Sequence, residues 1–289
     1  MDLFKTLDGV DIRKRRTLLR ALVLSARPVQ LLKTVVAVGW GQYCADSNNL
    51  ELSGRALLTL LGMIILSAGL YGLNDIADLG MDRRTLYKKC RPLPAGSINT
   101  RQLFIFSAVQ LGVALSVLAG VSFITFAWAI ILIANQICYS FESIRLKRRF
   151  GLDVLSAALL SHGARFAVGF RGGRFSMNTV LACAALVLWK VAAYLTYRLT
   201  DNPACDEPET DTTHTLGVRN ITYVSAAAFL ISYVCFGLYA FRSHMGLFAS
   251  TFITTLYATA FILYLIFTKL VSVGNPWKLL VFSVIGQSK

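Results

Sequence analysis

The chain has 289 residues, of which 55% are hydrophobic and only 15% are charged. Soluble domains carry about 25% charged residues. Because the apolar residues here fall into long runs, the composition excludes a soluble domain and indicates an all-α, polytopic membrane bundle that forms a single domain, 1–289. The net charge of +14 does not indicate nucleic-acid binding, because the basic residues lie between the apolar runs, where topology signals and contacts with anionic lipids place them.

Eight apolar segments have roughly the length that a transmembrane helix needs, about 20 residues. A ninth apolar stretch, Trp277–Ile285, follows a Gly-Asn-Pro turn and is either the stub of a ninth helix or a re-entrant end, of which we favour the stub. The eight predicted spans are, in chain order, Val29–Cys44, Ala56–Leu73, Leu103–Leu118, Val121–Tyr139, Val154–Phe170, Thr179–Thr196, Ile221–Ala240 and Leu247–Val271.

The loops between these spans alternate in charge. The N-terminal segment, 1–26, and the loops after the second and fourth spans are rich in Lys and Arg, whereas the intervening loops are poor in both. Cytoplasmic loops carry the excess of basic residues in membrane proteins. We therefore expect the N-terminus and the even-numbered loops to be cytoplasmic.

Three carboxylates follow the second span. Asp75, Asp78 and Asp82 have the spacing i, i+3, i+7, so on a helix they share one face. Such a set requires a cation, and oxygen ligands of this kind suit Mg²⁺, which binds through one or two carboxylates together with substrate phosphates. Lys88 and Arg91 come shortly afterwards and are candidates to bind those phosphates. The alternative is a solvated helix end whose carboxylates balance neighbouring arginines.

Two basic residues are predicted to lie inside spans. Arg165 falls within the fifth span, where a charge is costly and faces a cavity or a partner. It is a candidate to contact a phosphate or an acidic residue, and the alternative is a structural ion pair. Lys33, one turn into the first span, either extends to lipid headgroups or lines a pocket, and we favour the pocket.

The motif formed by Asn74, Asp75, Asp78 and Asp82, followed by Arg91-Pro-Leu-Pro-Ala-Gly96, resembles the signature of the UbiA superfamily of intramembrane prenyltransferases. Weaker resemblance extends over most of the chain, including Arg27–Gln30 and the stretch from Tyr139 to Lys147. The resemblance implies nine helices around a central cavity that opens to the cytoplasmic side. It also implies an Mg²⁺ cofactor and a second acidic motif after the sixth span.

The second acidic motif departs from the family pattern. Asp201, Asp206 and Asp211 are five residues apart, and two prolines favour a loop. Asp201 is the preferred second carboxylate, because it continues a helical stripe down the sixth span. For Asp206 and Asp211 the alternative is a solvated loop. The stripe consists of Lys190, Tyr194, Tyr197 and Asp201.

The site that the resemblance implies has four groups of residues. The catalytic carboxylates are Asp75, Asp78 and Asp201. The diphosphate-binding residues are Asn74, Lys88, Arg91, Arg145, Lys147, Arg165 and Lys190. The substrate pocket contains Lys33, Tyr139, Tyr194 and Tyr197. The metal ligands come from Asp75, Asp78, Asp82, Asp201, Asp206 and Asp211.

The implied activity is Mg²⁺-dependent transfer of a prenyl group from a prenyl diphosphate to an aromatic or other small lipophilic acceptor in the lipid bilayer, with release of pyrophosphate. An alternative in the same superfamily is phosphoribosyl transfer from phosphoribosyl pyrophosphate to a polyprenyl phosphate. Lys88 stands at the position of that branch's lysine, but Thr85-Leu86 replaces its His-Pro pair. A transporter of an anionic substrate is a further alternative, although the sequence has no evident paired halves.

Overall fold

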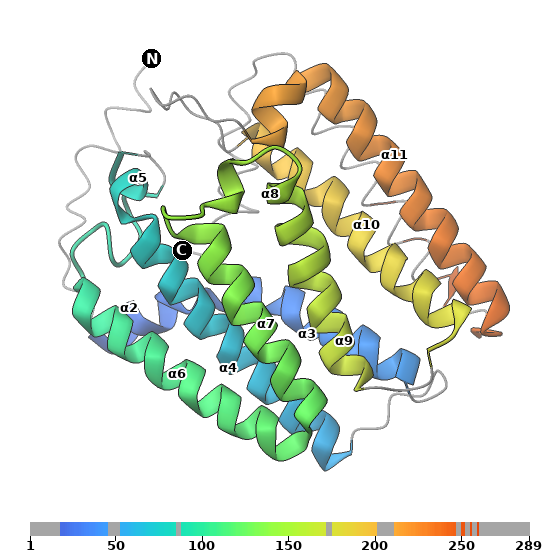
Figure 1. The fold of residues 1–289 in the computed structure, drawn as a ribbon, viewed down its shortest axis with the longest axis horizontal. Helices are drawn as coiled ribbons and strands as arrows, with labels where there is room; N and C mark the ends of the chain where they lie inside the picture. The colour runs from blue at the N-terminus through green and yellow to red at the C-terminus, as the bar shows by residue number, and fades with distance from the viewer. Residues whose placement is uncertain are drawn as a thin grey trace.

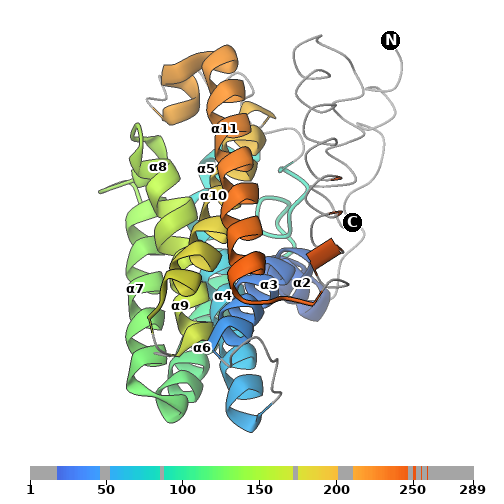
Figure 2. The same cartoon turned by 90° about the vertical axis from the view of Figure 1, so that its right-hand side faces the viewer.

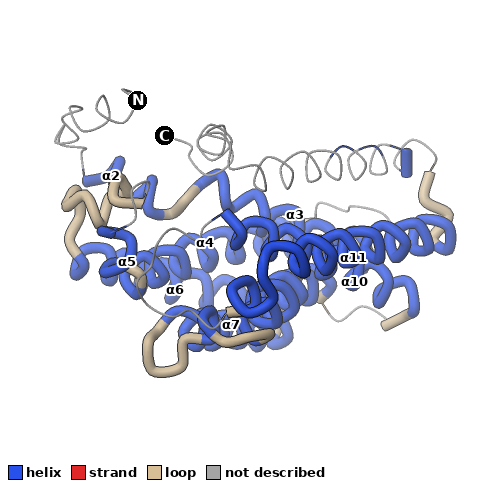
Figure 3. The backbone as a smooth tube through the Cα atoms, turned by 90° about the horizontal axis from the view of Figure 1, so that it is seen from above, coloured by secondary structure: helices blue, strands red, loops and turns tan. Residues whose placement is uncertain are grey.

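The computed structural model describes residues 18–45, 53–84, 88–171, 175–200 and 211–246, together with Ser250, Thr251, Thr255 and Thr259. Over these residues the secondary structure consists of helices and turns, with no strand (Figure 3). The helices are α2 (Leu18–Ser25), α3 (Pro28–Ala45), α4 (Gly54–Ala77), α5 (Leu79–Arg84), α6 (Thr100–Val121), α7 (Phe123–Ser140), η1 (Leu146–Arg148), α8 (Leu152–Val154), η2 (Leu155–Gly163), α9 (Ala164–Phe170), α10 (Met177–Thr200) and α11 (Thr212–Arg242).

Six helices are long and apolar enough to cross a membrane. They correspond to the first four, the sixth and the seventh predicted spans, which are thereby confirmed as long apolar helices. The six are Leu18–Ala45, Gly54–Ala77, Thr100–Val121, Phe123–Ser140, Met177–Arg198 and Thr212–Arg242. The ninth predicted span, and all of the eighth except its four described helical residues, lie outside the described residues.

The fifth predicted span, Val154–Phe170, is helical but changes type along its length. It begins in α8, continues as the π-helix η2, and returns to α-helical geometry in α9. A π-helical segment is rare and commonly occurs at functional sites. Here it directly precedes α9, the helix that contains Arg165.

Local sequence accounts for several helix starts. The side chain of Ser53 caps α4 by accepting from the backbone N–H of Ala56 at 3.2 Å. A reciprocal capping box between Asn99 and Gln102 starts α6. Ser122 both ends α6 and caps α7, which makes the connection between these two helices a tight antiparallel turn.

The helices pack in two groups that share α3 and α9. In Figure 1, α4, α6 and α7 lie side by side, and α10 and α11 form a neighbouring antiparallel pair. The first core joins α3, α4, α6, α7 and α9, and the second joins α3, α9, α10 and α11. Outward-facing side chains such as Phe104, Val109, Leu230 and Ile231 are more than half exposed. An apolar outer surface of this extent fits a lipid environment.

The polar segments gather at one end of the bundle, which we call the acidic end. It contains α5, α8 and the beginning of α11, which lie at the top of Figures 1 and 2. The acidic residues at the end of α4 and in α5 therefore lie close to the loop between α7 and α8.

Glycines allow α3 and α9 to approach closely. A Cβ atom added at Gly169 would overlap the backbone carbonyl of Val38, and one added at Gly41 would overlap that of Phe166. Small residues at helix contacts permit such packing between membrane helices. The close approach positions α9, and with it Arg165, against α3.

We expect Gly169→Ala to destabilise the protein by about 1–3 kcal/mol, because the new methyl group meets backbone rather than a movable side chain. Thermal unfolding of the purified protein in detergent measures this. The matched control is Gly112→Ala on α6, where an added Cβ meets nothing within 4 Å, and stability should be unchanged or slightly increased. Equal stability of the two variants would contradict the α3–α9 contact.

Candidate active site

The three carboxylates of the first motif occupy the end of α4 and the start of α5. The helix does not continue unbroken through all three, as the i, i+3, i+7 interpretation assumed. α4 ends at Ala77, Asp78 is its C-cap with φ −93° and ψ 1°, and α5 begins at Leu79. The backbone N–H of Asp82 still donates to the carbonyl of Asp78 at 2.9 Å, so the segment remains tightly wound and Asp75 and Asp82 stay close together.

Asp75 and Asp82 are buried, each with 2% of its surface exposed, and they share a cation. The guanidinium of Arg91 lies 2.7 Å from a carboxylate oxygen of Asp82 and 3.6 Å from one of Asp75. Arg27 forms a second ion pair with Asp75. Arg27 lies between α2 and α3 in a left-handed conformation (φ 51°). Buried carboxylates require such partners, and Arg27 is a site residue to which the sequence analysis gave no role.

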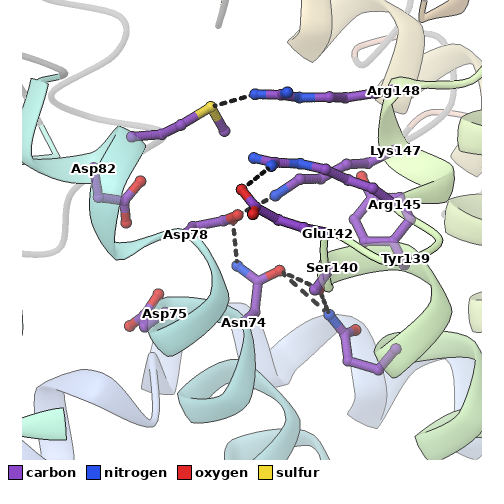
Figure 4. Close-up of polar contacts among 12 residues, drawn as sticks. Asn74, Asp75, Asp78, Asp82, Tyr139, Ser140, Glu142, Arg145, Lys147 and Arg148 are labelled. Atoms are coloured by element: carbon purple, nitrogen blue, oxygen red, sulfur yellow. Dashed lines mark hydrogen bonds and ion pairs between the residues drawn. The ribbon is translucent and has the colours of Figure 1, made fainter.

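Asp78 faces the opposite side of the site. It pairs with Lys147 from the loop after α7 and accepts a hydrogen bond from the side-chain amide of Asn74 at 3.1 Å (Figure 4). The amide oxygen of Asn74 accepts from Ser140 at 2.9 Å and from Gln136 at 3.3 Å. The predicted residues Asn74, Asp78 and Lys147 are thus brought together by α4 and α7.

Burial has an electrostatic cost at this end. It raises the pKa of the Asp82 carboxyl, and Arg91 and Lys88 act in the opposite direction. Burial lowers the pKa of the Lys88 ammonium to about 8, although nearby Asp82 favours its charge. The pKa of Lys147 is lowered for the same reason and is partly restored by Asp78. Partly desolvated charges of this kind are typical of functional sites.

Arg145 lies beside this network, but its ion pair with Glu142 points outward. It binds Glu142 at 2.6 Å, and the Glu142 side chain is 83% exposed. Arg145 itself is buried and adopts φ 46°, a left-handed conformation. A non-glycine residue held in this region is often found at a functional site. Figure 4 shows Arg145, Lys147 and Arg148 reaching toward the acidic segment.

Only part of the second acidic segment is described. α10 runs to Thr200, and Asp201 and Asp206 lie outside the described residues. Asp211 is buried, caps α11 by accepting from the backbone N–H of His214 at 2.7 Å, and pairs with Arg198. Of the predicted stripe, Tyr194 is buried, whereas Tyr197 is 43% exposed.

Asp153, which the sequence analysis did not single out, joins three elements at the acidic end. It is fully buried and accepts from the hydroxyl of Thr212 and from that residue's backbone N–H at 3.3 Å. Tyr194 donates to Asp153 at 3.4 Å and lies 3.2 Å from the hydroxyl of Tyr139. Asp153 is the sole acidic residue between positions 143 and 200, a signal that could have identified it.

The remaining predicted residues lie deeper in the bundle. Arg165 is buried and donates to Thr34 at 3.2 Å and to the carbonyl of Ser161 at 2.8 Å. Lys33 on α3 and Lys190 on α10 lie within electrostatic range of Arg165. Lys33 also lies within electrostatic range of Arg27, which pairs with Asp75 at the acidic end.

The donor set at the acidic end fits Mg²⁺. Over the described residues, no group of three or more His, Cys, Asp or Glu side chains converges as a metal site. However, Asp75 and Asp82 both reach the guanidinium of Arg91, so two carboxylates face one position. Mg²⁺ commonly uses one or two carboxylates and takes its other ligands from substrate phosphates and water.

An apolar helical bundle with a buried network of acids and bases at one end defines a membrane protein with a polar site. A model of the UbiA prenyltransferase family matches residues 34–285, and the chain belongs to this family.

Several 4-hydroxybenzoate octaprenyltransferases are similar to this chain over part of their length. A 4-hydroxybenzoate octaprenyltransferase of Pseudomonas aeruginosa is 28% identical over 183 residues, which cover 62% of this chain and 60% of that protein. The enzyme of that name from Azotobacter vinelandii is 26% identical over 181 residues, with coverage of 62% and 60%. The matched region therefore spans about 60% of the length of these relatives.

The fold is shared with solved structures of the family. A UbiA homologue from Archaeoglobus fulgidus bound to GPP and Mg²⁺ has a TM-score of 0.66 at 19% identity, covering 92% of this chain and 95% of that one. A homologue from Aeropyrum pernix has a TM-score of 0.65 at 16% identity, covering 88% and 97%. At these identities the likeness establishes the fold.

We expect Asp153→Ala to lower the midpoint of thermal unfolding by about 4 °C or more, because hydrogen bonds to a charged group contribute about 1.5–3 kcal/mol and three donors would be lost. The control is Glu142→Ala, an exposed acid whose ion pair contributes about 0–1 kcal/mol. If the two variants unfolded at the same temperature, Asp153 would not hold α8, α10 and α11 together.

Proposed function

We propose that the protein is an intramembrane transferase that moves a prenyl group from a prenyl diphosphate to a small lipophilic or aromatic acceptor and releases pyrophosphate. The observation that carries this proposal is the buried arrangement at the acidic end, where Asp75 and Asp82 face Arg91 and Asp78 faces Lys147. An acid–base network of this kind provides ligands for a divalent cation and donors for a diphosphate at the same place.

In the proposed complex, Asp75, Asp78 and Asp82 hold Mg²⁺, and the predicted Asp201 remains a candidate to do so. When bound, Mg²⁺ supplies positive charge that stabilises the diphosphate leaving group. The basic side chains of Lys88, Arg91 and Lys147, with Arg145 beside them, bind the phosphate oxygens. Because these cations neutralise carboxylates in the described structure, metal and diphosphate can enter with little change in total charge.

The reaction breaks the bond between C1 of the prenyl group and the diphosphate oxygen, and the electron pair leaves with the diphosphate. C1 then bonds to the acceptor, which loses a proton as the product forms. The developing negative charge on the diphosphate is stabilised by the fixed guanidinium and ammonium groups. The apolar helices hold the isoprenoid tail and exclude water, so that the allylic cation meets the acceptor instead.

Relatives and structural neighbours support prenyl rather than phosphoribosyl transfer. The named relatives are octaprenyltransferases, and the Archaeoglobus fulgidus homologue binds GPP. The phosphoribosyl alternative shares the need for a metal and for release of pyrophosphate. It is therefore distinguished by the diphosphate substrate that the purified protein consumes.

We expect Asp75→Asn and Asp82→Asn each to reduce product formation at least about 100-fold, because each removes a carboxylate from the charge network around the leaving group. The assay supplies geranylgeranyl diphosphate and 4-hydroxybenzoate to purified protein, with and without Mg²⁺, and measures prenylated product and pyrophosphate.

Glu142→Gln serves as the control for these substitutions, because its side chain is 83% exposed, and it should retain activity. Full activity of Asp75→Asn would exclude the proposed site. A parallel reaction with phosphoribosyl pyrophosphate and a polyprenyl phosphate tests the alternative, and a labelled lipid product there would replace the prenyl assignment.

A further inference from the structure

A continuous chain of hydrogen bonds links α7 to the first acidic motif. It consists of Gln136 and Ser140 on α7, Asn74 in the last turn of α4, and Asp78 at the end of that helix. The side-chain nitrogen of Gln136 lies 2.7 Å from the hydroxyl of Ser140 and 3.3 Å from the amide oxygen of Asn74. Figure 4 shows Asn74 between Ser140 and Asp78, and Asn74 donates to Asp78 at 3.1 Å. We call these four residues the amide chain.

The Asp78 carboxylate sets the direction of the amide chain. It forms an ion pair with Lys147, and a carboxylate in such a pair only accepts hydrogen bonds. The group of Asn74 that faces Asp78 is therefore its NH2 group, and its amide oxygen faces α7. The two α7 side chains that contact this oxygen must both donate. Every hydrogen bond in the amide chain thus points from Gln136 toward Asp78.

The amide chain holds the Asn74 side chain in one orientation. The amide oxygen has two acceptor positions, which are filled by Ser140 at 2.9 Å and by Gln136 at 3.3 Å. A flip of the amide would lose these two hydrogen bonds and the one to Asp78, and it would turn the oxygen toward a carboxylate. Ser140 is 1% exposed, so water does not reach its hydroxyl to replace the lost bond.

The two oxygens of Asp78 have partners of different charge. Oδ1 pairs with the ammonium of Lys147, whereas Oδ2 accepts from the neutral amide of Asn74. A metal ion that approaches the carboxylate repels an ammonium group but not a neutral amide. In the proposed complex Lys147 binds phosphate oxygens, and the hydrogen bond from Asn74 is the one that persists. Asn74 therefore holds the carboxylate while its cationic partner is exchanged.

We infer that Gln136 and Ser140 are positioning residues for the metal site. They hold the amide of Asn74, and Asn74 holds the Asp78 carboxylate in the orientation that receives Mg²⁺. Loss of a group that orients a metal ligand commonly costs about 10–100-fold in metal affinity. The inference rests on the proposed function, because it takes Asp78 as a ligand of Mg²⁺.

Asn135, the residue before Gln136, offers a matched comparison. Its side chain donates to the carbonyl of Ser156 at 3.3 Å and accepts from the hydroxyl of that residue at 2.7 Å. Asn135 therefore also links α7 to another helix by two side-chain hydrogen bonds, but its partner lies on η2 and is not a carboxylate. A purely structural role for Gln136 predicts that its loss resembles the loss of Asn135.

Magnesium binding without turnover separates the two roles. Purified protein in nanodiscs would be saturated with geranylgeranyl S-thiolodiphosphate, a poorly reactive analogue of a prenyl diphosphate, with no acceptor added. We would then titrate Mg²⁺ and follow the shift in thermal unfolding. Gln136→Met should weaken Mg²⁺ binding at least about tenfold. Asn135→Met should lower the unfolding midpoint and leave the Mg²⁺ affinity unchanged.

A double-mutant cycle tests whether Gln136 acts through Asn74. Asn74→Ala removes the side chain that the two α7 residues hold, and it should itself weaken Mg²⁺ binding. In that background Gln136→Met should cause no further loss of Mg²⁺ affinity, because the effects of residues in one hydrogen-bond network are not additive. Ser140→Ala removes a single donor and should weaken Mg²⁺ binding by a smaller factor, which provides a second variant if Gln136→Met does not fold.

Two results would overturn the inference: an Mg²⁺ affinity that is the same in wild type, Gln136→Met and Ser140→Ala, or additive losses in the cycle with Asn74→Ala. Failure of the proposed function has a different signature. In that case the wild-type protein itself would not be stabilised by Mg²⁺ in the presence of the analogue, or the Asp75→Asn variant would be active, and the inference would fail with it.

Discussion

Asp75, Asp78 and Asp82 are carboxylates at the edge of an apolar bundle, and each needs a cation close by. The cations come from different parts of the chain: Arg27 from the turn before α3, Arg91 from the loop after α5, and Lys147 from the loop after α7. Removing either partner of a buried ion pair leaves an uncompensated charge. These ion pairs therefore fix the positions of three segments around the end of α4: the turn before α3, the loop after α5 and the loop after α7.

The bundle treats its buried charges in two ways. At the acidic end every carboxylate of the first motif is matched by a base, and α10 and α11 are joined by the pair of Arg198 and Asp211. Deeper inside, the guanidinium of Arg165 donates only to hydroxyl and carbonyl groups of the described residues.

Much of the fold was predictable, because a membrane-spanning helix requires a long apolar run and such runs are visible in the sequence. Six spans agree with the structure to within a few residues at most ends. The break at Asp78 was not predictable, since the spacing of the three acids is equally compatible with one continuous helix. The π-helical geometry of η2 also has no evident sequence signal.

Contacts between residues far apart in the sequence were the part of the site that the sequence predicted least well. The sequence indicated that Lys147 and Asp78 belong together only through a family resemblance, and it gave no indication that Arg27 reaches Asp75. Asp211 was considered as a metal ligand or a solvated loop residue, whereas it is a buried helix cap that pairs with Arg198. Such roles depend on the packing of α8, α10 and α11, which local periodicity does not encode.

One feature of α11 bears on how the protein responds to its membrane. Gly217 has φ 72° and ψ 166° within this helix, so the short helical turn that follows Asp211 is set apart from the long apolar portion. Thr212, on the near side of this break, is bonded to Asp153. Bilayers of different thickness are accommodated by changes in helix tilt. Because the break separates the two portions, the long portion of α11 can change its tilt while the first turn stays bonded to Asp153.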